Sequence, residues 1–415
     1  MRRSLKVLIA AAAATVAGWI AAPMFAGPGG SSRAAYALAD APVSEAGRID
    51  YAALDRDLTT LAARPEMAGL AVAVVEDGKL RFVRTYGVAD RETGAPVTAR
   101  TVFRWASVSK TATGLLAADL AKQGALDLDR PVASWPNSLR LPGGADTRLS
   151  LAQLLSHQTG LTKNAYDERL EGGEGPASIR TQLAAAPLQC PPGTCHTYQN
   201  VAFDAAAEIL GSAAREPFAD AVEDMLFAPL GMKSARYGMA GLTEAKDWAR
   251  PYRNGQVRPL KEAYWRVPAA AGVESDIVDF ATWMQAMMGA FPGIVSPAVL
   301  QTAHAPRTRT PRLYNGDLAR ALSNATYGLG WRSFTYEGRS LAGHSGAVDG
   351  YRATMIFEPA TRTGVVALWN SDWGRPFRIP FAVLDSYHKR PDSRWLDLSD
   401  LPPQTGDPAP PDTAH

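Results

Sequence analysis

The sequence has few of the residues on which metal or redox chemistry depends. Its 415 residues include two cysteines and six histidines, and neither a Cys-x-x-Cys pair nor a His-Glu-x-x-His string occurs. Zinc and other transition-metal sites need clusters of such ligands. We therefore expect a protein that works without a metal or another cofactor.

The chain also has almost no excess of positive or negative charge. The formal net charge is +2, and residues 1–39 hold four basic residues and no acidic one, which leaves 39 basic and 41 acidic residues in the rest. Without a basic surface field we expect no nucleic-acid partner. Hydrophobic residues make up 46% and charged residues 20% of the chain, a composition that excludes a mostly disordered protein. The length favours two lobes. We expect the protein to be a monomer.

Long apolar runs are confined to the N-terminus. A basic start with Arg2, Arg3 and Lys6 precedes an uncharged apolar run over 7–26, and the small residues of 37–39 suit signal cleavage. We predict a signal peptide over 1–39 and a periplasmic or secreted protein; the start also fits the core of a twin-arginine signal. The apolar run is long enough to span a bilayer, so an uncleaved anchor is the alternative and the one expected membrane contact.

The two cysteines, Cys190 and Cys195, lie five positions apart across a Pro-Pro-Gly-Thr segment. An exported protein meets an oxidising compartment, which favours a disulfide. Two free thiols stay open, because spacing alone does not fix the geometry that a disulfide needs.

Strand patterns lie toward both ends of the chain, and helical patterns fill the middle. Hairpins are predicted at 69–87 and 350–369, and helices at 109–123, 150–157, 201–210, 217–226 and 275–288. This order predicts an α+β fold, in which an antiparallel sheet built from the N- and C-terminal segments is flanked by helices and carries an inserted, mainly helical lobe.

The lobe boundaries follow from the same patterns. We assign the sheet lobe to residues 40–130 and 300–390, the helical lobe to 131–299 and a flexible tail to 391–415. The cleft between the two lobes is the expected ligand site.

Three short motifs could carry chemistry there. Ser107 and Lys110 are spaced to share one face of a helix start, where the amine could help the serine lose its proton. Tyr198 and Asn200, two apart on an extended segment, face the same way; the phenol could relay a proton and the amide could hold a substrate carbonyl. The string 344–346 (HSG) precedes the last hairpin; there a bare glycine on an edge strand would let a substrate backbone pair.

With these three motifs in order, the chain resembles the serine β-lactamase and penicillin-binding protein superfamily, nearest the branch of class C β-lactamases, DD-carboxypeptidases and related esterases. Further similar strings are 103–110 (FRWASVSK), 154–161 (LLSHQTGL), 192–194 (PGT), 271–275 (AGVES) and 327–331 (YGLGW). The resemblance covers about residues 50–390. It implies a β-lactamase/transpeptidase-like fold and a small-molecule or peptide acyl substrate: a β-lactam, a D-amino-acid peptide or an ester.

The resemblance also implies roles. Ser107 would be the acylated nucleophile, and Lys110 and Tyr198 would share the roles of general base and general acid. Asn200 would bind the amide of the substrate's acyl side chain. The backbone N–H groups of Ser107 and Ala347 would form the oxyanion hole.

One departure concerns the third motif, His344, Ser345 and Gly346, which we expect with Ala347 to bind substrate. β-Lactamases of this branch usually carry lysine where this chain has His344. A histidine near its ordinary pKa of about 6.5 would bear only part of a charge, which disfavours efficient β-lactam turnover.

Two other functions fit some of the same residues. The chain could be a non-catalytic sensor that binds penicillins or peptidoglycan peptides, since the same motif side chains would serve it. It could also be an α/β-hydrolase esterase with Ser345 as the nucleophile, because 343–347 (GHSGA) nearly matches a nucleophile elbow and Asp385 and His388 follow in order. The helices that precede this string argue against that alternative.

Overall fold

The computed structural model describes residues 47–310, 314, 316–390 and 394–399. The predicted signal peptide over 1–39 lies outside these residues, as does the predicted tail 391–415 apart from 394–399. Within the described part, no helix combines the length and the apolar character needed to cross a bilayer.

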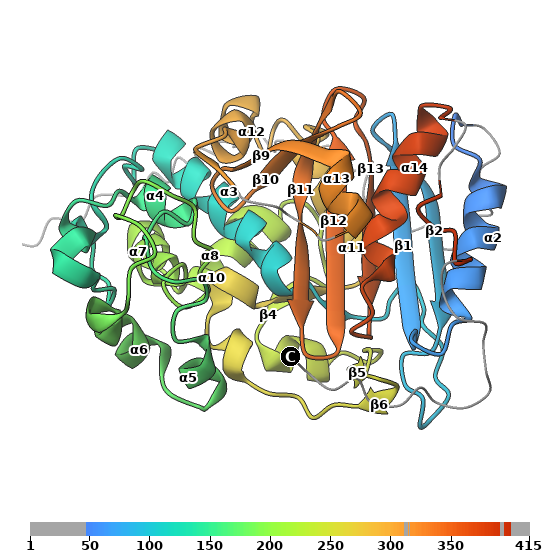
Figure 1. The fold of residues 1–415 in the computed structure, drawn as a ribbon, viewed down its shortest axis with the longest axis horizontal. Helices are drawn as coiled ribbons and strands as arrows, with labels where there is room; N and C mark the ends of the chain where they lie inside the picture. The colour runs from blue at the N-terminus through green and yellow to red at the C-terminus, as the bar shows by residue number, and fades with distance from the viewer. Residues whose placement is uncertain (1–46, 311–313, 315, 391–393, 400–415) are drawn as a thin grey trace, which may run out of the picture.

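An eight-stranded antiparallel sheet crosses the molecule (Figure 1). Its strands, in spatial order, are β2 (Lys79–Gly87), β1 (Gly69–Glu76), β13 (Thr363–Trp369), β12 (Tyr351–Glu358), β11 (Arg339–Val348), β10 (Arg332–Tyr336), β9 (Leu322–Tyr327) and β8 (Thr308–Arg309). The N-terminal hairpin β1–β2 thus pairs directly with the C-terminal hairpin β12–β13. Both predicted hairpins and the predicted origin of the sheet are confirmed.

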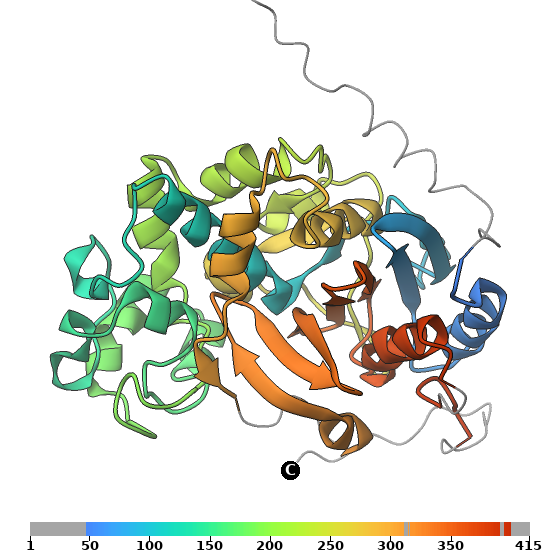
Figure 2. The same cartoon turned by 90° about the horizontal axis from the view of Figure 1, so that it is seen from above.

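Helices cover both faces of this sheet. Along β1, Leu70, Val72 and Val74 pack against α2 (Tyr51–Ala62) and α14 (Ile379–Tyr387), whereas the alternate residues face α11 (Ile277–Met287). Figure 2 shows the sheet between these two helical layers. Since successive side chains of a strand point to opposite faces, a strand that is covered twice is apolar throughout. This explains why the segment LAVAVV carries no polar alternation.

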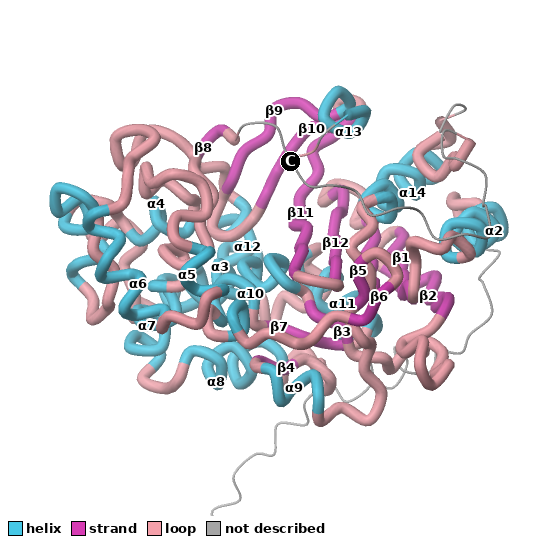
Figure 3. Tube along the Cα trace, turned by 60° about the horizontal axis from the view of Figure 1, so that its bottom comes forward, coloured by secondary structure: helices cyan, strands magenta, loops and turns pink. Residues whose placement is uncertain are grey.

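The middle of the chain is mainly helical and lies beside β8–β12 (Figure 3). Its central helix is α3 (Ser109–Lys122), whose first ten residues are all buried. The others are α4 (Leu151–Leu155), α5 (Asp167–Glu171), α6 (Pro176–Gln182), α7 (Ala205–Ala214), α8 (Phe218–Val222), α9 (Met239–Thr243), α10 (Pro268–Ala271) and α12 (Pro297–His304). The short helix α13 (Gly316–Ala321) lies instead on the main sheet, where Leu318 packs with Phe334 and Phe381. A small sheet of β3 (Phe103–Arg104), β7 (Val273–Ser275) and β4 (Arg236–Tyr237) lies against α3, and β5 (Tyr252–Arg253) and β6 (Gln256–Val257) form a hairpin.

Two predicted helices have different bounds in the structure. The helix predicted at 201–210 runs as α7 from Ala205 to Ala214, after turns over 201–204; its N-cap, Asp204, makes no capping hydrogen bond, because its side chain accepts from the side chain of Arg180 and the backbone of Ala269. The helix predicted at 217–226 ends as α8 at Val222 and continues as a wider π-turn over Glu223–Phe227. Neither change could be read from apolar spacing.

Candidate active site

Ser107 lies on a short helical turn, Ala106–Val108, that leads into α3. Ala106 has φ 48°, in the left-handed region that non-glycine residues rarely adopt. The Ser109 hydroxyl donates to the Ala106 carbonyl at 2.7 Å and accepts from the N–H of Val273 at 3.0 Å, which ties the turn to β7. Strain of this kind persists where surrounding contacts enforce it, and it is common at functional sites.

Strand β11 passes directly beside this turn. A side chain at Gly346 would place its Cβ 2.1 Å from the carbonyl oxygen of Trp105 and 3.0 Å from the nitrogen of Ser107. The turn of Ser107 therefore itself requires a glycine at 346, whereas the approach of a substrate backbone there stays a prediction. The expected edge strand is also only local: β11 lies inside the sheet, but its last residues, 344–348, pair with β12 alone.

Lys110 lies one turn after Ser107, fully buried beneath it. Its Nζ is 3.5 Å from Ser107 Oγ, and it donates to Asn200 Oδ1 at 2.8 Å and to the carbonyl of Ala270 at 3.0 Å. A lysine ammonium has three N–H donors, and each one has an acceptor here. The structure therefore brings the predicted Ser107, Lys110 and Asn200 together.

Tyr198 completes this group from the loop before α7. Its ring centroid lies 4.7 Å from Lys110 Nζ and 4.3 Å from the ring of His157. His157 Nδ1 accepts from the backbone N–H of Gln199, which fixes the segment that carries the tyrosine. His157 therefore supports Tyr198 both by ring contact and through the backbone of the next residue.

These residues surround a cavity of about 840 Å³. Lys110 does not line it and reaches Ser107 from below. The predicted residues that line it are Ser107, Tyr198, Asn200, His344, Ser345, Gly346 and Ala347.

His344 is neutral in this setting. Its Nδ1 lies 2.8 Å from the carbonyl oxygen of Ser345, which can only accept, so Nδ1 carries the hydrogen. Nε2 then accepts from the hydroxyl of Tyr327, 2.8 Å away. Burial, with Arg332 and Lys110 nearby, holds the pKa of His344 well below its usual range. The expected partial charge on this histidine is therefore wrong.

The positive charge at this end of the cavity comes from Arg332 on β10. Its guanidinium lies 5.4 Å from the ring centroid of Tyr198 and 5.1 Å from that of Tyr327, and the side chain lines the cavity. No carboxylate among the described residues forms an ion pair with it. Arg332 directly follows the YGLGW string at 327–331, and this position is the sequence signal that could have located it.

Ser345 is not placed as a nucleophile. Its hydroxyl lies 2.8 Å from that of Tyr314, and the presumed partners are bound elsewhere: His388 lies 2.7 Å from Glu358, and Asp385 accepts from tyrosine and tryptophan side chains. Together with the antiparallel sheet, this excludes the α/β-hydrolase alternative.

Cys190 and Cys195 form a disulfide in the structure. The loop that it closes rests on the segment before it: the N–H of Gly193 donates to the carbonyl of Gln158 and that of Gln189 to the carbonyl of Gly160, each at 2.7 Å. Gln189 lines the cavity. We predict that the bridge stiffens this wall and the approach to Tyr198.

The family model described as Beta-lactamase matches residues 54–383. The chain belongs to the β-lactamase family. The esterase EstB of Burkholderia gladioli is 31% identical over 244 residues, 52% of this chain and 61% of the esterase, so the chain spans about three fifths of that relative's length. A β-lactamase of Pseudomonas fluorescens is 24% identical over 361 residues, 79% of this chain and 96% of that enzyme.

A solved structure has the same fold. The octameric penicillin-binding protein homologue from Pyrococcus abyssi superposes with a TM-score of 0.72 at 23% identity, covering 81% of this chain and 77% of the other. At that identity the likeness concerns the fold alone. The β-lactamase/transpeptidase-like fold expected from the sequence is thereby confirmed.

Proposed function

We propose that this β-lactamase-family protein is an exported serine hydrolase that cleaves an ester or amide through an acyl-enzyme on Ser107. The proposal rests on one observation: Lys110 Nζ approaches Ser107 Oγ to 3.5 Å at the floor of an open cavity. An amine so placed can take the serine proton when it is itself unprotonated, which turns a weak nucleophile into an effective one.

The remaining groups support the later steps. As Ser107 Oγ bonds to the substrate carbonyl, its proton passes to Lys110 and through Tyr198 to the leaving alcohol or amine, whose bond to the carbonyl carbon breaks. The N–H groups of Ser107 and Ala347, which both line the cavity, would hold the oxyanion. Water then adds to the acyl carbon and releases the acid.

Arg332 indicates the substrate's charge. A guanidinium without a carboxylate partner among the described residues favours a substrate that carries an anionic group on that side. A carboxylate-bearing ester, a D-amino-acid peptide and a β-lactam all fit this requirement. The relatives named esterase and β-lactamase support the same range.

The test is intact-mass spectrometry and turnover with a nitrophenyl ester, a D-Ala-D-Ala peptide and nitrocefin. We expect a transient adduct on Ser107 and turnover, both abolished in Ser107→Ala and slowed about 10²–10⁴-fold in Lys110→Met. Ser345→Ala is the matched control, because Ser345 lines the same cavity and should only reduce the rate. An adduct that never clears would favour the sensor; the absence of any adduct on Ser107 would refute both readings.

A further inference from the structure

A buried carboxylate lies behind the catalytic group, outside every motif of the sequence. Asp167 is the first residue of α5 and is 7% exposed. Its Oδ2 accepts from Asn200 Nδ2 at 2.7 Å and from the hydroxyl of Tyr264 at 3.3 Å. Its Oδ1 is buried without a hydrogen-bond partner among the described residues. A carboxylate placed in this way acts on its neighbours chiefly through Oδ2.

The partners of Asn200 decide which way its amide faces. Lys110 can only donate, so it selects Oδ1, and an ionised Asp167 can only accept, so it selects Nδ2. Both ends of the amide are therefore occupied within the protein. A turned amide would point its NH₂ group at the Lys110 ammonium and its oxygen at the Asp167 carboxylate, and both contacts would be repulsive.

We infer that Asp167 is a positioning residue for acyl transfer: it fixes the Asn200 amide and, through Asn200 Oδ1, holds Lys110 against Ser107. This inference rests on the proposed function. It gives Asn200 a second role beside binding the acyl side chain of a substrate: one N–H of its amide donates to Asp167, and the other remains for the substrate.

The surroundings of Asp167 make its charge sensitive to pH. Burial raises the pKa of Asp167 to about 6, although the hydrogen bond from Asn200 and the charge of Lys110 oppose this rise. The other titratable groups that face it are Tyr264, from the turn Ala263–Trp265, and Glu171, later in α5; the Tyr264 hydroxyl also donates to Glu171 at 2.7 Å. Below about pH 6 Asp167 is protonated, and its carboxyl group can then donate as well as accept, so it no longer selects Nδ2 of Asn200 over Oδ1 and the rate of acylation should fall.

Two variants separate position from charge. Asp167→Asn keeps an oxygen for Asn200 Nδ2 and for Tyr264 but does not titrate. Its amide, like a protonated Asp167, can face Asn200 with a donor or an acceptor, so we expect it to acylate at about the low-pH rate of the wild type throughout and to lose the acidic limb near pH 6. Asp167→Leu removes the acceptor, so kcat should fall about 10–100-fold while KM stays within about twofold.

The experiment measures single-turnover acylation of the full chain by a nitrophenyl ester from about pH 4.5 to 8, with circular dichroism as a check of folding. Asp146→Leu is the matched control: Asp146 is a buried aspartate that accepts from the backbone N–H of Leu141 and does not line the cavity. It should lose stability and keep both kcat and the acidic limb.

A folded Asp167→Leu variant that acylates at the wild-type rate would overturn the inference. So would Asp167→Asn with the wild-type acidic limb, and this isosteric variant decides the matter if the leucine variant does not fold. Wild-type protein that never acylates on Ser107 would instead overturn the proposed function and the inference together.

Discussion

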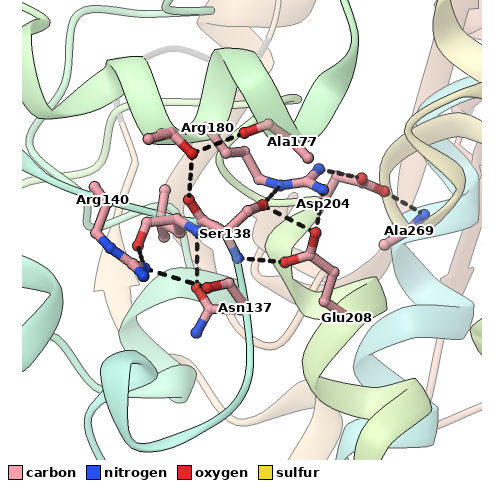
Figure 4. A network of polar contacts seen from close by, with 10 residues as sticks. Asn137, Ser138, Arg140, Ala177, Arg180, Asp204, Glu208 and Ala269 are labelled. Atoms are coloured by element: carbon pink, nitrogen blue, oxygen red, sulfur yellow. Dashed lines mark hydrogen bonds and ion pairs between the residues drawn. The ribbon is translucent and has the colours of Figure 1, made fainter.

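Replacing Arg180 by methionine should destabilise the protein strongly, because this arginine is the buried centre of a polar network. Its guanidinium pairs with Asp204 and Glu208, each at 2.7 Å, and donates to Ser138 (Figure 4). The side chains of Arg180 and Asp204 are 5% and 3% exposed. Removing one partner of such a pair leaves an uncompensated buried charge, which costs about 3–5 kcal/mol.

Urea unfolding followed by circular dichroism measures this cost. With a urea m value of about 3 kcal/mol/M, the midpoint should fall by about 1 M or more. Arg169→Met is the matched control, since Arg169 pairs with Glu174 at 2.7 Å in the same lobe but with both side chains about 30% exposed. Exposed pairs contribute about 0–1 kcal/mol. If both variants lost the same small amount of unfolding free energy, the argument from burial would be refuted.

Further outcomes follow from the cavity. Arg332→Gln should raise KM about tenfold for carboxylate-bearing substrates and leave neutral nitrophenyl esters unchanged, because a charge-assisted hydrogen bond is worth about 1.5–3 kcal/mol; equal effects on both substrates would count against a charge contact. The KM of the carboxylate substrate should stay flat from about pH 6 to 8, since the pKa of His344 lies well below its usual value; a titration there would contradict a neutral His344. Gly346→Ala should lower kcat at least tenfold by pushing on the Trp105 carbonyl, whereas Gly293→Ala, with no atom within 4 Å of its added Cβ, should not; equal kcat in both would argue against the close approach.

The fold could be predicted from the sequence because its strands can be recognised from local sequence patterns. The turn at Asp77 and Gly78 and the apolar runs around it define a hairpin without any long-range information. What the sequence could not supply was register across the sheet. The pairing of distant strands decides that β10 begins opposite Gly343, so that the next residues of β11 are not paired with β10 and face the cavity on that side.

The candidate site could be predicted where its residues have a fixed spacing in the sequence. It could not be predicted where a property depends on contacts between residues that are far apart in the chain. Ser107 and Lys110 are one helical turn apart, so their meeting follows from helix geometry. The charge state of His344 does not follow from any local pattern, because the residues that influence it, Arg332 and Lys110, lie 12 and 234 positions away in the chain. Asp167 gave no signal at all, since an aspartate at a helix start is an ordinary residue.

Two separate supports fix the Lys110 ammonium, and each ends in a buried aspartate. Asp204 accepts from the N–H of Ala269 at 2.9 Å and so holds α10, whose next carbonyl, that of Ala270, accepts from Lys110; Asp167 holds Asn200, which accepts from it as well. The turn of Ser107 is fixed by other elements, β7 and β11. The contact between Ser107 and Lys110 therefore depends on several elements, since α10 and Asn200 hold the amine while β7 and β11 hold the turn. At 3.5 Å it is longer than a strong hydrogen bond, so small shifts of α10 or of Asn200 should change the rate of proton transfer before they change the fold.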